Sequence, residues 1–176
     1  MIRGEKVALR TRRDSDVPVF QAELYEDVRE RSGSDSGPWR PLPADAEGSA
    51  ASMAKPSAGT AWFSVVEGES QDLAGEALLW QIDPHNRSAH LGISLLPAFR
   101  GRGLGTDVVR VLCEYGFAVR GLRRLQIETL ADNTAMTTAA ARTGFSVEGT
   151  LRSAAWVYGA FADVVVLGLL AEEWTP

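Results

Sequence analysis

The stretch "LLPAFRGRGLGTDVV" (residues 95–109) decides the fold, because three alternating glycines and two arginines run directly into an apolar, helix-like segment. Glycine has no Cβ, so Gly101, Gly103 and Gly105 permit left-handed backbone and the close approach of another molecule. A helix that begins after such a turn offers free N–H groups and the positive end of its dipole. The stretch therefore predicts an anion-binding loop between a strand and a helix.

Two phosphate-binding motifs with a similar glycine content do not fit this loop. A Walker loop carries Lys followed by Ser or Thr after its last glycine, whereas Thr106 follows Gly105 directly. A G-x-G-x-x-G dinucleotide motif requires glycine at position 106 and normally opens a parallel β–α–β unit. The loop alone leaves open a third alternative, in which the glycines only make a tight turn from strand to helix.

The composition favours a single globular domain over residues 1–176. The chain has 45% hydrophobic residues and a formal net charge of −5, from 18 Lys and Arg against 23 Asp and Glu. This balance disfavours nucleic acid and membrane surfaces as partners and favours a cationic small partner such as an amine. Cys113 stands alone, and no apolar run has the length of a signal or a membrane span, so we expect a soluble, cytoplasmic protein. No His or Cys cluster has metal-ligand spacing, so we expect no metal.

The hydrophobic pattern predicts an α+β fold with a mixed, mainly antiparallel sheet flanked by helices. We expect strands at 6–10, 60–68, 73–83, 87–96 and 123–130, then two long C-terminal strands that turn near Gly159. We expect helices at 14–32, at 103–119, and from the N-cap Asn133 to a C-terminal turn at Gly144. The middle helix places Asp107, Arg110 and Glu114 on its polar face.

The segment Arg100-Gly101-Arg102-Gly103-Leu104-Gly105 resembles the [Q/R]-x-x-G-x-[G/A] signature of the GCN5-related N-acetyltransferases. The later segments "ETLADNTAM", "ARTGF" and "VEGTLRSAAWVYGAFADVVVLGLLAEEW" resemble the RimJ/RimL-like branch of that family. The resemblance implies a GNAT-like fold with splayed central strands, and an N-acetyltransferase that moves an acetyl group from acetyl-CoA to a primary amine. It implies direct transfer in a ternary complex, with a protein N-terminus or a small-molecule amine as acceptor. Together with the long apolar C-terminal strands, it favours a homodimer.

The resemblance also implies a coenzyme A site along the glycine loop. The backbone N–H groups of residues 101–106 suit a pyrophosphate, and the side chains of Arg100 and Arg102 add positive charge. The family implies that the pantetheine arm bonds the open backbone at Ser94–Leu96 and the side chain of Asn133, which also suits a helix N-cap. The expected coenzyme-binding residues are Ser94, Leu95, Leu96, Arg100, Gly101, Arg102, Gly103, Leu104, Gly105, Thr106 and Asn133.

The side chains that similar enzymes use for proton transfer are absent here. Met136 and Ala155 stand where the RimJ/RimL-like branch has a serine and a glutamate, and Ala140 stands near the tyrosine of other branches. His90 in "SAHLGI" is the candidate catalytic base, because its unperturbed pKa of ~6.5 suits proton removal at neutral pH. The alternative is a structural, hydrogen-bonded histidine. The absent groups also motivate a second hypothesis, a noncatalytic acyl-CoA-binding module.

Other polar and aromatic residues receive structural interpretations. Glu148 and Asp163 match acidic positions of the branch and are interpreted as anchors, with amine binding as the alternative. We expect His85 to be solvated in a turn and Cys113 to pack in the core without acting as a nucleophile. Residues 32–60 are expected to shape the acceptor pocket, where Trp39 either closes the edge of the core or lines the pocket.

Overall fold

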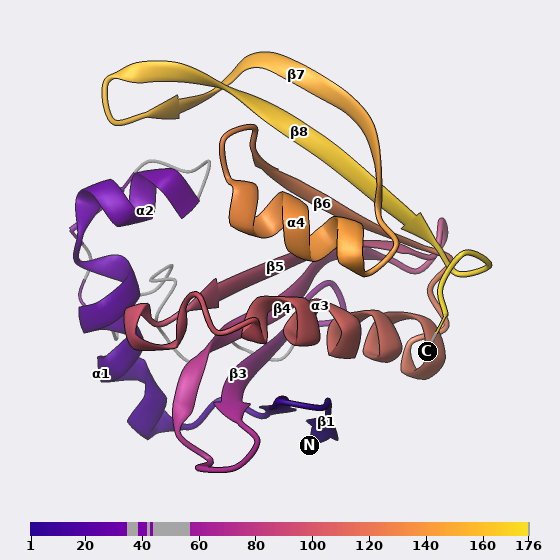
Figure 1. The fold of residues 1–176 in the computed structure, drawn as a ribbon, viewed down its shortest axis with the longest axis horizontal. Helices are drawn as coiled ribbons and strands as arrows, with labels where there is room; N and C mark the ends of the chain where they lie inside the picture. The colour runs from indigo at the N-terminus through magenta and orange to yellow at the C-terminus, as the bar shows by residue number, and fades with distance from the viewer. Residues whose placement is uncertain (35–38, 42, 44–56, 176) are drawn as a thin grey trace.

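Eight strands form one sheet in the order β1-β2-β3-β4-β5-β6-β8-β7 in this computed structural model (Figure 1). The structure describes residues 1–34, 39–41, 43 and 57–175. All neighbouring strands pair antiparallel except β5 and β6, which are parallel. The strands are β1 (Ile2–Arg3), β2 (Val7–Arg10), β3 (Ala61–Glu67), β4 (Leu73–Asp83), β5 (Ser88–Leu95), β6 (Arg124–Leu130), β7 (Ser146–Val157) and β8 (Ala160–Leu170). The predicted mixed, mainly antiparallel α+β fold is confirmed.

The parallel pairing of β5 with β6 is short. It joins Ser88–His90 to Arg124–Gln126 and ends there, while β5 continues to Leu95 paired only with β4. Beyond His90 the β5 edge that faces β6 therefore pairs with no described strand, and the two strands diverge. This is the splay of central strands that the family resemblance implied.

Two helices lie side by side on one face of the sheet (Figure 1). They are α3 (Leu104–Glu114), which continues as a π-helical turn (Tyr115–Val119), and α4 (Thr134–Arg142). The apolar side of α3 buries Leu104, Val108 and Leu112 against strand residues of the core. Gly144 ends α4 with φ +94°, and Gly159 turns the β7–β8 hairpin with φ +98°, as predicted. No helix in the described ranges is long and apolar enough to span a bilayer.

The prediction of one helix over 14–32 is wrong. The structure has a 3-10 turn (Asp14–Asp16), α1 (Val17–Phe20), a π-helical turn (Gln21–Tyr25) and α2 (Val28–Ser34). The last break lies at Asp27, whose Oδ1 accepts hydrogen bonds from the N–H groups of Arg29 at 2.8 Å and Glu30 at 2.9 Å. An aspartate that bonds the backbone ahead of it starts a new helix in place of continuing the old one.

The helical segments between Asp14 and Ser34 form the first helical arm of the chain. A buried carboxylate joins this first helical arm to the sheet face opposite α3. Glu76 on β4 is 2% exposed and accepts hydrogen bonds from the Tyr25 hydroxyl and the Arg12 guanidinium. Burial raises the pKa of Glu76, while Arg12 and the Tyr25 hydroxyl act to lower it. Residues at alternate positions share one face of a strand, so Glu76 lies on the same face as Trp80, the cross-strand neighbour of His90.

Asp107 holds the N-terminal strands against α3, which corrects its predicted place on the polar face of the helix. It is 3% exposed, and its Oδ2 accepts hydrogen bonds from the N–H groups of Lys6 at 2.7 Å and Val7 at 3.0 Å. A Cβ at Gly4 would lie 2.5 Å from the same oxygen, so only glycine fits there. Because Asp107 is in the first turn of α3, these bonds also fix the position of the glycine loop.

Replacing Asp107 is expected to destabilise the protein. Asp107→Ala leaves the N–H groups of Lys6 and Val7 without their acceptor, and an unpaired buried group costs about 1–3 kcal/mol. We expect a loss of about 3 kcal/mol, measured as a lower midpoint of thermal unfolding, and a smaller loss for Asp107→Asn, which keeps one acceptor oxygen. The exposed Asp72→Ala serves as control. Equal midpoints for Asp107→Ala and the control would contradict this role.

Candidate functional site

The loop between β5 and α3 adopts the conformation that its glycines predict. Gly101 has φ +73° and Gly103 has φ +77°, both in the left-handed region that favours glycine. Gly103 occupies the N-cap position of α3, and none of the described side chains caps the helix. The first N–H groups of α3 therefore have no intrahelical acceptor and remain available to an anion.

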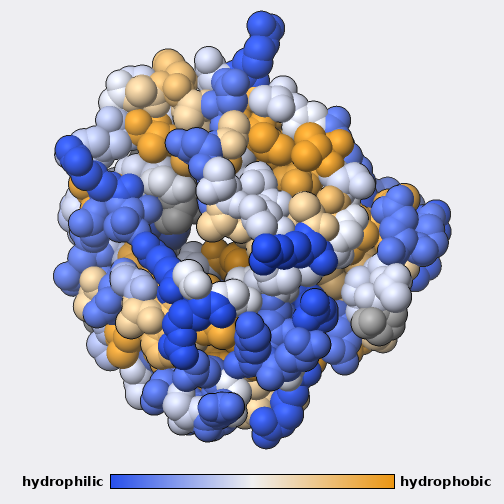
Figure 2. Space-filling view, in the orientation of Figure 1, coloured by the Kyte–Doolittle hydropathy of each residue, from blue (hydrophilic) through white to orange (hydrophobic). Residues whose placement is uncertain are grey.

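The start of α3 packs against the end of β5, which brings the two predicted coenzyme segments together. A Cβ at Gly105 would lie 3.6 Å from Ile93 Cδ1 and 3.9 Å from Leu95 Cδ1. Figure 2 shows this face of the molecule hollowed near the N-terminal end of α3, with hydrophilic side chains around the opening.

Hydrogen bonds at the end of β5 leave fewer free backbone groups in Ser94–Leu96 than predicted. The Leu96 N–H donates to the Ala74 carbonyl at 2.9 Å, so the Leu96 amide is already paired. Backbone groups point alternately to the two sides of a strand, so the Leu95 groups point away from β4, as do those of Ile93. The Leu95 carbonyl indeed accepts a hydrogen bond from Arg100 Nε at 3.0 Å. Of the predicted stretch, Leu95 is the residue whose N–H faces the open side.

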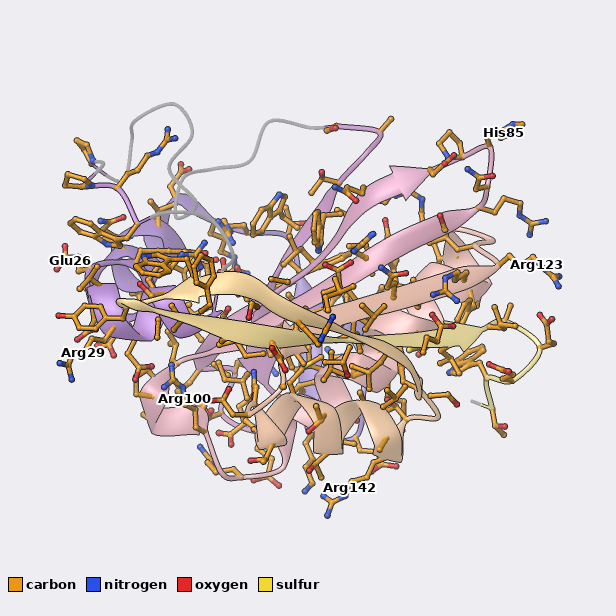
Figure 3. All side chains as sticks on the ribbon, turned by 90° about the horizontal axis from the view of Figure 1, so that it is seen from above. Glu26, Arg29, His85, Arg100, Arg123 and Arg142 are labelled. Carbon is orange, nitrogen blue, oxygen red and sulfur yellow. The ribbon has the colours of Figure 1, made fainter. Side chains whose placement is uncertain are left out.

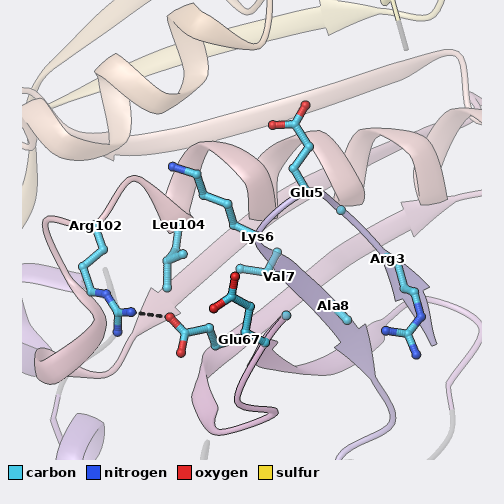
Figure 4. Close-up of a pocket in the computed structure, with 11 residues that line it drawn as sticks. Arg3, Glu5, Lys6, Val7, Ala8, Glu67, Arg102 and Leu104 are labelled. Carbon is cyan, nitrogen blue, oxygen red and sulfur yellow. Dashed lines mark hydrogen bonds and ion pairs between the residues drawn. The ribbon is translucent and has the colours of Figure 1, made fainter.

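Both arginines of the loop are paired with carboxylates. Arg100 Nη1 lies 2.7 Å from Glu30 Oε2 on α2, and Arg102 forms an ion pair with Glu67 on β3. The Arg102–Glu67 pair lines a cavity of about 450 Å³ between the N-terminal strands and α3 (Figure 4). An anion at this loop would meet the backbone N–H groups directly, whereas it would compete with Glu30 and Glu67 for the two guanidinium groups.

Lys6 adds a cation beside the loop that the sequence analysis missed. Its Nζ lies 3.4 Å from the position that a Cβ at Gly103 would occupy. Lys6 is far from the loop in sequence, and it reaches Gly103 because Asp107 holds its backbone against α3.

Asn133 has the N-cap role predicted for it. Its Oδ1 accepts a hydrogen bond from the Met136 N–H at 3.1 Å, and its Nδ2 donates to Thr129 Oγ1 at 3.0 Å. The side chain thus fixes the start of α4 beside the end of β6. Binding of the pantetheine arm by Asn133 stays a prediction.

His90 lies at the point where β5 and β6 diverge, as the last residue of β5 that pairs with β6. Its ring centroid is 4.6 Å from that of Trp80, and its side chain is 21% exposed. The Nδ1 atom is buried, has no hydrogen-bond partner among the described residues, and lies 3.8 Å from Glu128 Oε1. The pKa of His90 lies below its usual value, chiefly because the ring is buried. Glu128 acts to raise this pKa, and Arg124 acts to lower it. The ring is therefore neutral at neutral pH and able to accept a proton.

The positions at which the family resemblance places proton-transfer groups are apolar and buried in this chain. Met136, Ala140 and Ala155 are all less than one-tenth exposed. Cys113 is fully buried, and burial raises the pKa of its thiol to about 12, so it is not a nucleophile at neutral pH. His85 is exposed and lies at the opposite end of the molecule from Arg100 (Figure 3).

Glu148 and Asp163 are held as expected for structural anchors. Glu148 Oε1 accepts a hydrogen bond from Arg124 Nη1 at 2.7 Å, and Asp163 Oδ1 accepts one from the Ser153 N–H at 2.8 Å. Trp39 donates its indole N–H to the Tyr25 carbonyl at 2.9 Å, beside the first helical arm. Most of the acceptor pocket predicted at 32–60 lies outside the described residues, so its shape stays a prediction.

A family match agrees with this geometry. Residues 6–146 match the acetyltransferase (GNAT) domain. The chain belongs to the GNAT acetyltransferase family. The predicted recognition is confirmed, including the similarity to ribosomal-protein acetyltransferases of the RimJ/RimL-like branch.

Curated relatives of this GNAT protein match it over part of their length. YdaF of Bacillus subtilis (strain 168), named as a ribosomal N-acetyltransferase, is 33% identical over 102 residues, which are 58% of this chain and 56% of YdaF. The spermidine N(1)-acetyltransferase of Escherichia coli (strain K12) is 30% identical over 108 residues, 58% of each chain. The chain thus matches less than two thirds of the length of these relatives.

Solved structures extend the similarity of the fold over nearly the whole chain. The spermidine N-acetyltransferase of Vibrio cholerae in complex with CoA and spermine superimposes with a TM-score of 0.78 at 18% identity, covering 95% of this chain and 96% of that chain. A GCN5-related N-acetyltransferase from Brucella melitensis gives a TM-score of 0.77 at 27% identity, covering 98% of this chain and 79% of that chain. These matches confirm the GNAT fold.

Substitutions in the glycine loop are expected to separate backbone from side-chain binding of coenzyme A. Gly103→Val adds a branched side chain at a left-handed position and blocks the approach to the α3 N-terminus, so we expect affinity to fall about 10- to 100-fold. Arg102→Ala removes a paired guanidinium and is expected to lower affinity about threefold or less. Calorimetric titration with coenzyme A measures both.

Gly121→Val is the matched control, because Gly121 also has a left-handed φ, of +62°, but lies outside the loop. Wild-type affinity in Gly103→Val, or equal losses in Gly103→Val and Gly121→Val, would remove the loop from the coenzyme site.

Proposed function

We propose that the chain is an acetyl-CoA-dependent N-acetyltransferase that forms one domain over residues 1–176. The observation that carries the proposal is the uncapped N-terminus of α3, which follows two left-handed glycines at the open edge of β5. This arrangement offers N–H groups to a pyrophosphate at one end and free strand backbone to an amide-containing arm along its length. Family membership supports the same coenzyme.

In the proposed reaction the loop and β5 hold acetyl-CoA while His90 removes a proton from the acceptor. Backbone N–H groups of residues 101–106 bind the pyrophosphate, and Leu95 bonds the pantetheine arm. The bare Nε2 of His90 takes one proton from the acceptor ammonium group, which frees the nitrogen lone pair. The nitrogen then forms a bond to the thioester carbonyl carbon, the carbon–sulfur bond breaks, and the departing thiolate takes the second proton from nitrogen.

The acceptor proposed for this reaction is a primary amine that is cationic in solution. The net charge of −5 and the partly exposed carboxylate of Glu128 beside His90 favour a cation near the point where β5 and β6 diverge. Relatives are named for spermidine and for ribosomal protein, so we propose a polyamine or a protein N-terminus as the acceptor class.

The second candidate function is a noncatalytic acyl-CoA-binding module. The burial of Met136, Ala140 and Ala155 favours it, because none of them can move a proton. A panel of polyamines and N-terminal peptides, assayed for free thiol with acetyl-CoA, distinguishes the two functions. An acetyltransferase releases thiol with at least one amine, whereas a binding module retains the coenzyme and releases none.

Removing the imidazole of His90 is expected to reduce turnover without loss of coenzyme binding. His90→Gln should lower kcat by roughly 10²–10⁴-fold, the range typical of a lost general base. Because burial lowers the pKa of His90, the wild-type kcat/KM should rise with pH through a pKa below 6.5, and the variant should lose this limb.

The unfolding midpoint and coenzyme affinity of His90→Gln are measured on the same preparation as its pH–rate profile. A stable variant that binds coenzyme A and keeps the wild-type profile would exclude His90 as the base. His85→Gln, at the exposed turn, is the control.

We also propose a homodimer that covers part of the β7 strand. β7 is an edge strand, with Val147 64% exposed and Leu151 48% exposed. Between α4 and β7 lies a shallow depression to which Phe145 and Val147 contribute, and Figure 2 shows hydrophobic surface on the upper part of this face. A second copy would remove this apolar surface from water.

Light scattering at micromolar concentration is expected to report a dimer for the wild type. Replacing Val147 and Leu151 together by glutamate is expected to give a monomer that still binds coenzyme A. A wild-type protein that is monomeric throughout this concentration range would reject the dimer.

A further inference from the structure

A row of polar side chains leads along β6 toward His90. Arg124, Gln126 and Glu128 occupy alternate positions of the strand and so share one face. Arg124 Nη2 donates to Gln126 Oε1 at 3.0 Å, and Gln126 Nε2 donates to Glu128 Oε1 at 2.8 Å. Since His90 pairs directly with Gln126 across the parallel ladder, its side chain lies on this face as well.

The row fixes the direction in which each member points. Glu148 on β7 holds Arg124, through a hydrogen bond of 2.7 Å from Nη1 to Oε1. Arg124 can only donate, so the oxygen of the Gln126 amide must face it and the NH₂ group must face Glu128. Gln126 therefore holds the Glu128 carboxylate through Oε1, the same oxygen that lies 3.8 Å from His90 Nδ1, and the remaining acceptor capacity of the carboxylate is available to His90.

The imidazole has one nitrogen that lacks a partner and one acceptor near it. Within the part of the chain that the structure describes, His90 Nδ1 is buried without a hydrogen bond, and 3.8 Å separates it from Glu128 Oε1. This separation exceeds hydrogen-bond length by an amount that a small side-chain rotation removes. Buried polar atoms in folded proteins are nearly always paired, and a carboxylate is the strongest acceptor available to an N–H group.

We propose that Glu128 is a positioning residue that accepts the Nδ1–H of His90 and thereby leaves Nε2 bare as the proton acceptor. The proposal rests on the acetyltransferase function proposed above. A carboxylate behind the ring also stabilises the imidazolium that forms when Nε2 takes a proton from the acceptor. Glu128 thus compensates for the burial of His90, which by itself disfavours the charged ring.

The described groups around His90 give the direction of the pH effect. On β6 the ring faces the negative charge of Glu128 and the positive charge of Arg124, and the latter is itself paired with Glu148 on β7. On β4 the ring contacts Trp80, which carries no charge. Removing the charge of Glu128 leaves burial and Arg124, both of which lower the pKa of His90.

The test compares the whole wild-type chain with Glu128→Gln, which keeps the shape of the side chain and its contact with Gln126. We expect kcat/KM for the acceptor to fall about 10- to 100-fold, the KM for acetyl-CoA to stay unchanged, and the acidic limb of the pH profile to move to lower pH. Nitrogen chemical shifts of the His90 ring give the readout without turnover. In the wild type the neutral His90 ring is expected to carry its proton on Nδ1. In the variant the neutral ring is expected to be a mixture of tautomers, and the pKa of His90 is expected to be lower.

Glu172→Gln is the matched control, because Glu172, like Glu128, is a partly exposed carboxylate; its partner is Arg123, at 2.9 Å. It is expected to change neither the ring shifts nor the pH profile. Identical tautomers and pKa values of His90 in the wild type and Glu128→Gln would overturn the proposal. A changed tautomer in Glu128→Gln, together with no thiol release by the wild type on any amine, would support the His90–Glu128 contact and contradict the acetyltransferase function.

Discussion

The site depends on the short parallel ladder between β5 and β6. After His90 the two strands share no further backbone hydrogen bonds, although β5 stays paired with β4 to its end. A parallel strand with one unpaired edge leaves donors and acceptors that a ligand or water must satisfy. The same divergence places His90 at the inner end of the open edge and the glycine loop at the outer end. In the function proposed above, the coenzyme and the proton acceptor would therefore share this one feature of the sheet.

Two buried carboxylates hold the elements around the point where β5 and β6 diverge. Asp107 holds the backbone of Lys6 and Val7 against the first turn of α3, and so fixes the loop that α3 follows. Glu76 bonds Tyr25 and Arg12 on the opposite face, and so places the first helical arm over the face that carries His90. The desolvation of such groups offsets much of their attraction, so they add little net stability, but removing one leaves its buried partners unpaired and is costly.

Periodic features of the sequence predicted the fold, and contacts between distant residues were what the sequence could not supply. The strands, α3, α4 and the glycine loop follow from alternation, from the helical period and from backbone conformations that require glycine. The break at Asp27 was missed because a side chain that bonds its own backbone competes with a helix at a single position. Asp107 was predicted on a polar face because helical periodicity shows no N-terminal strand packed beside it.

The candidate site likewise contains residues that the sequence predicted and residues that it did not. The loop and His90 were predicted from local pattern, and the structure places them at the two ends of one open strand edge. Lys6 and Glu128 were missed, because each reaches the site through strand pairing or a buried carboxylate far away in sequence. The prediction for Ser94–Leu96 narrowed to Leu95, since the direction of each amide depends on the register of β5 with β4.

Hydrogen exchange of backbone amides with and without coenzyme A tests the central claim most directly, because the proposed contacts are made by the amides themselves. The account predicts slower exchange on binding at Leu95 and at residues 101–106, with little change in the β1–β2 hairpin. Unchanged exchange at these amides, with protection instead around Lys6 and Glu67 in the cavity of Figure 4, would contradict it.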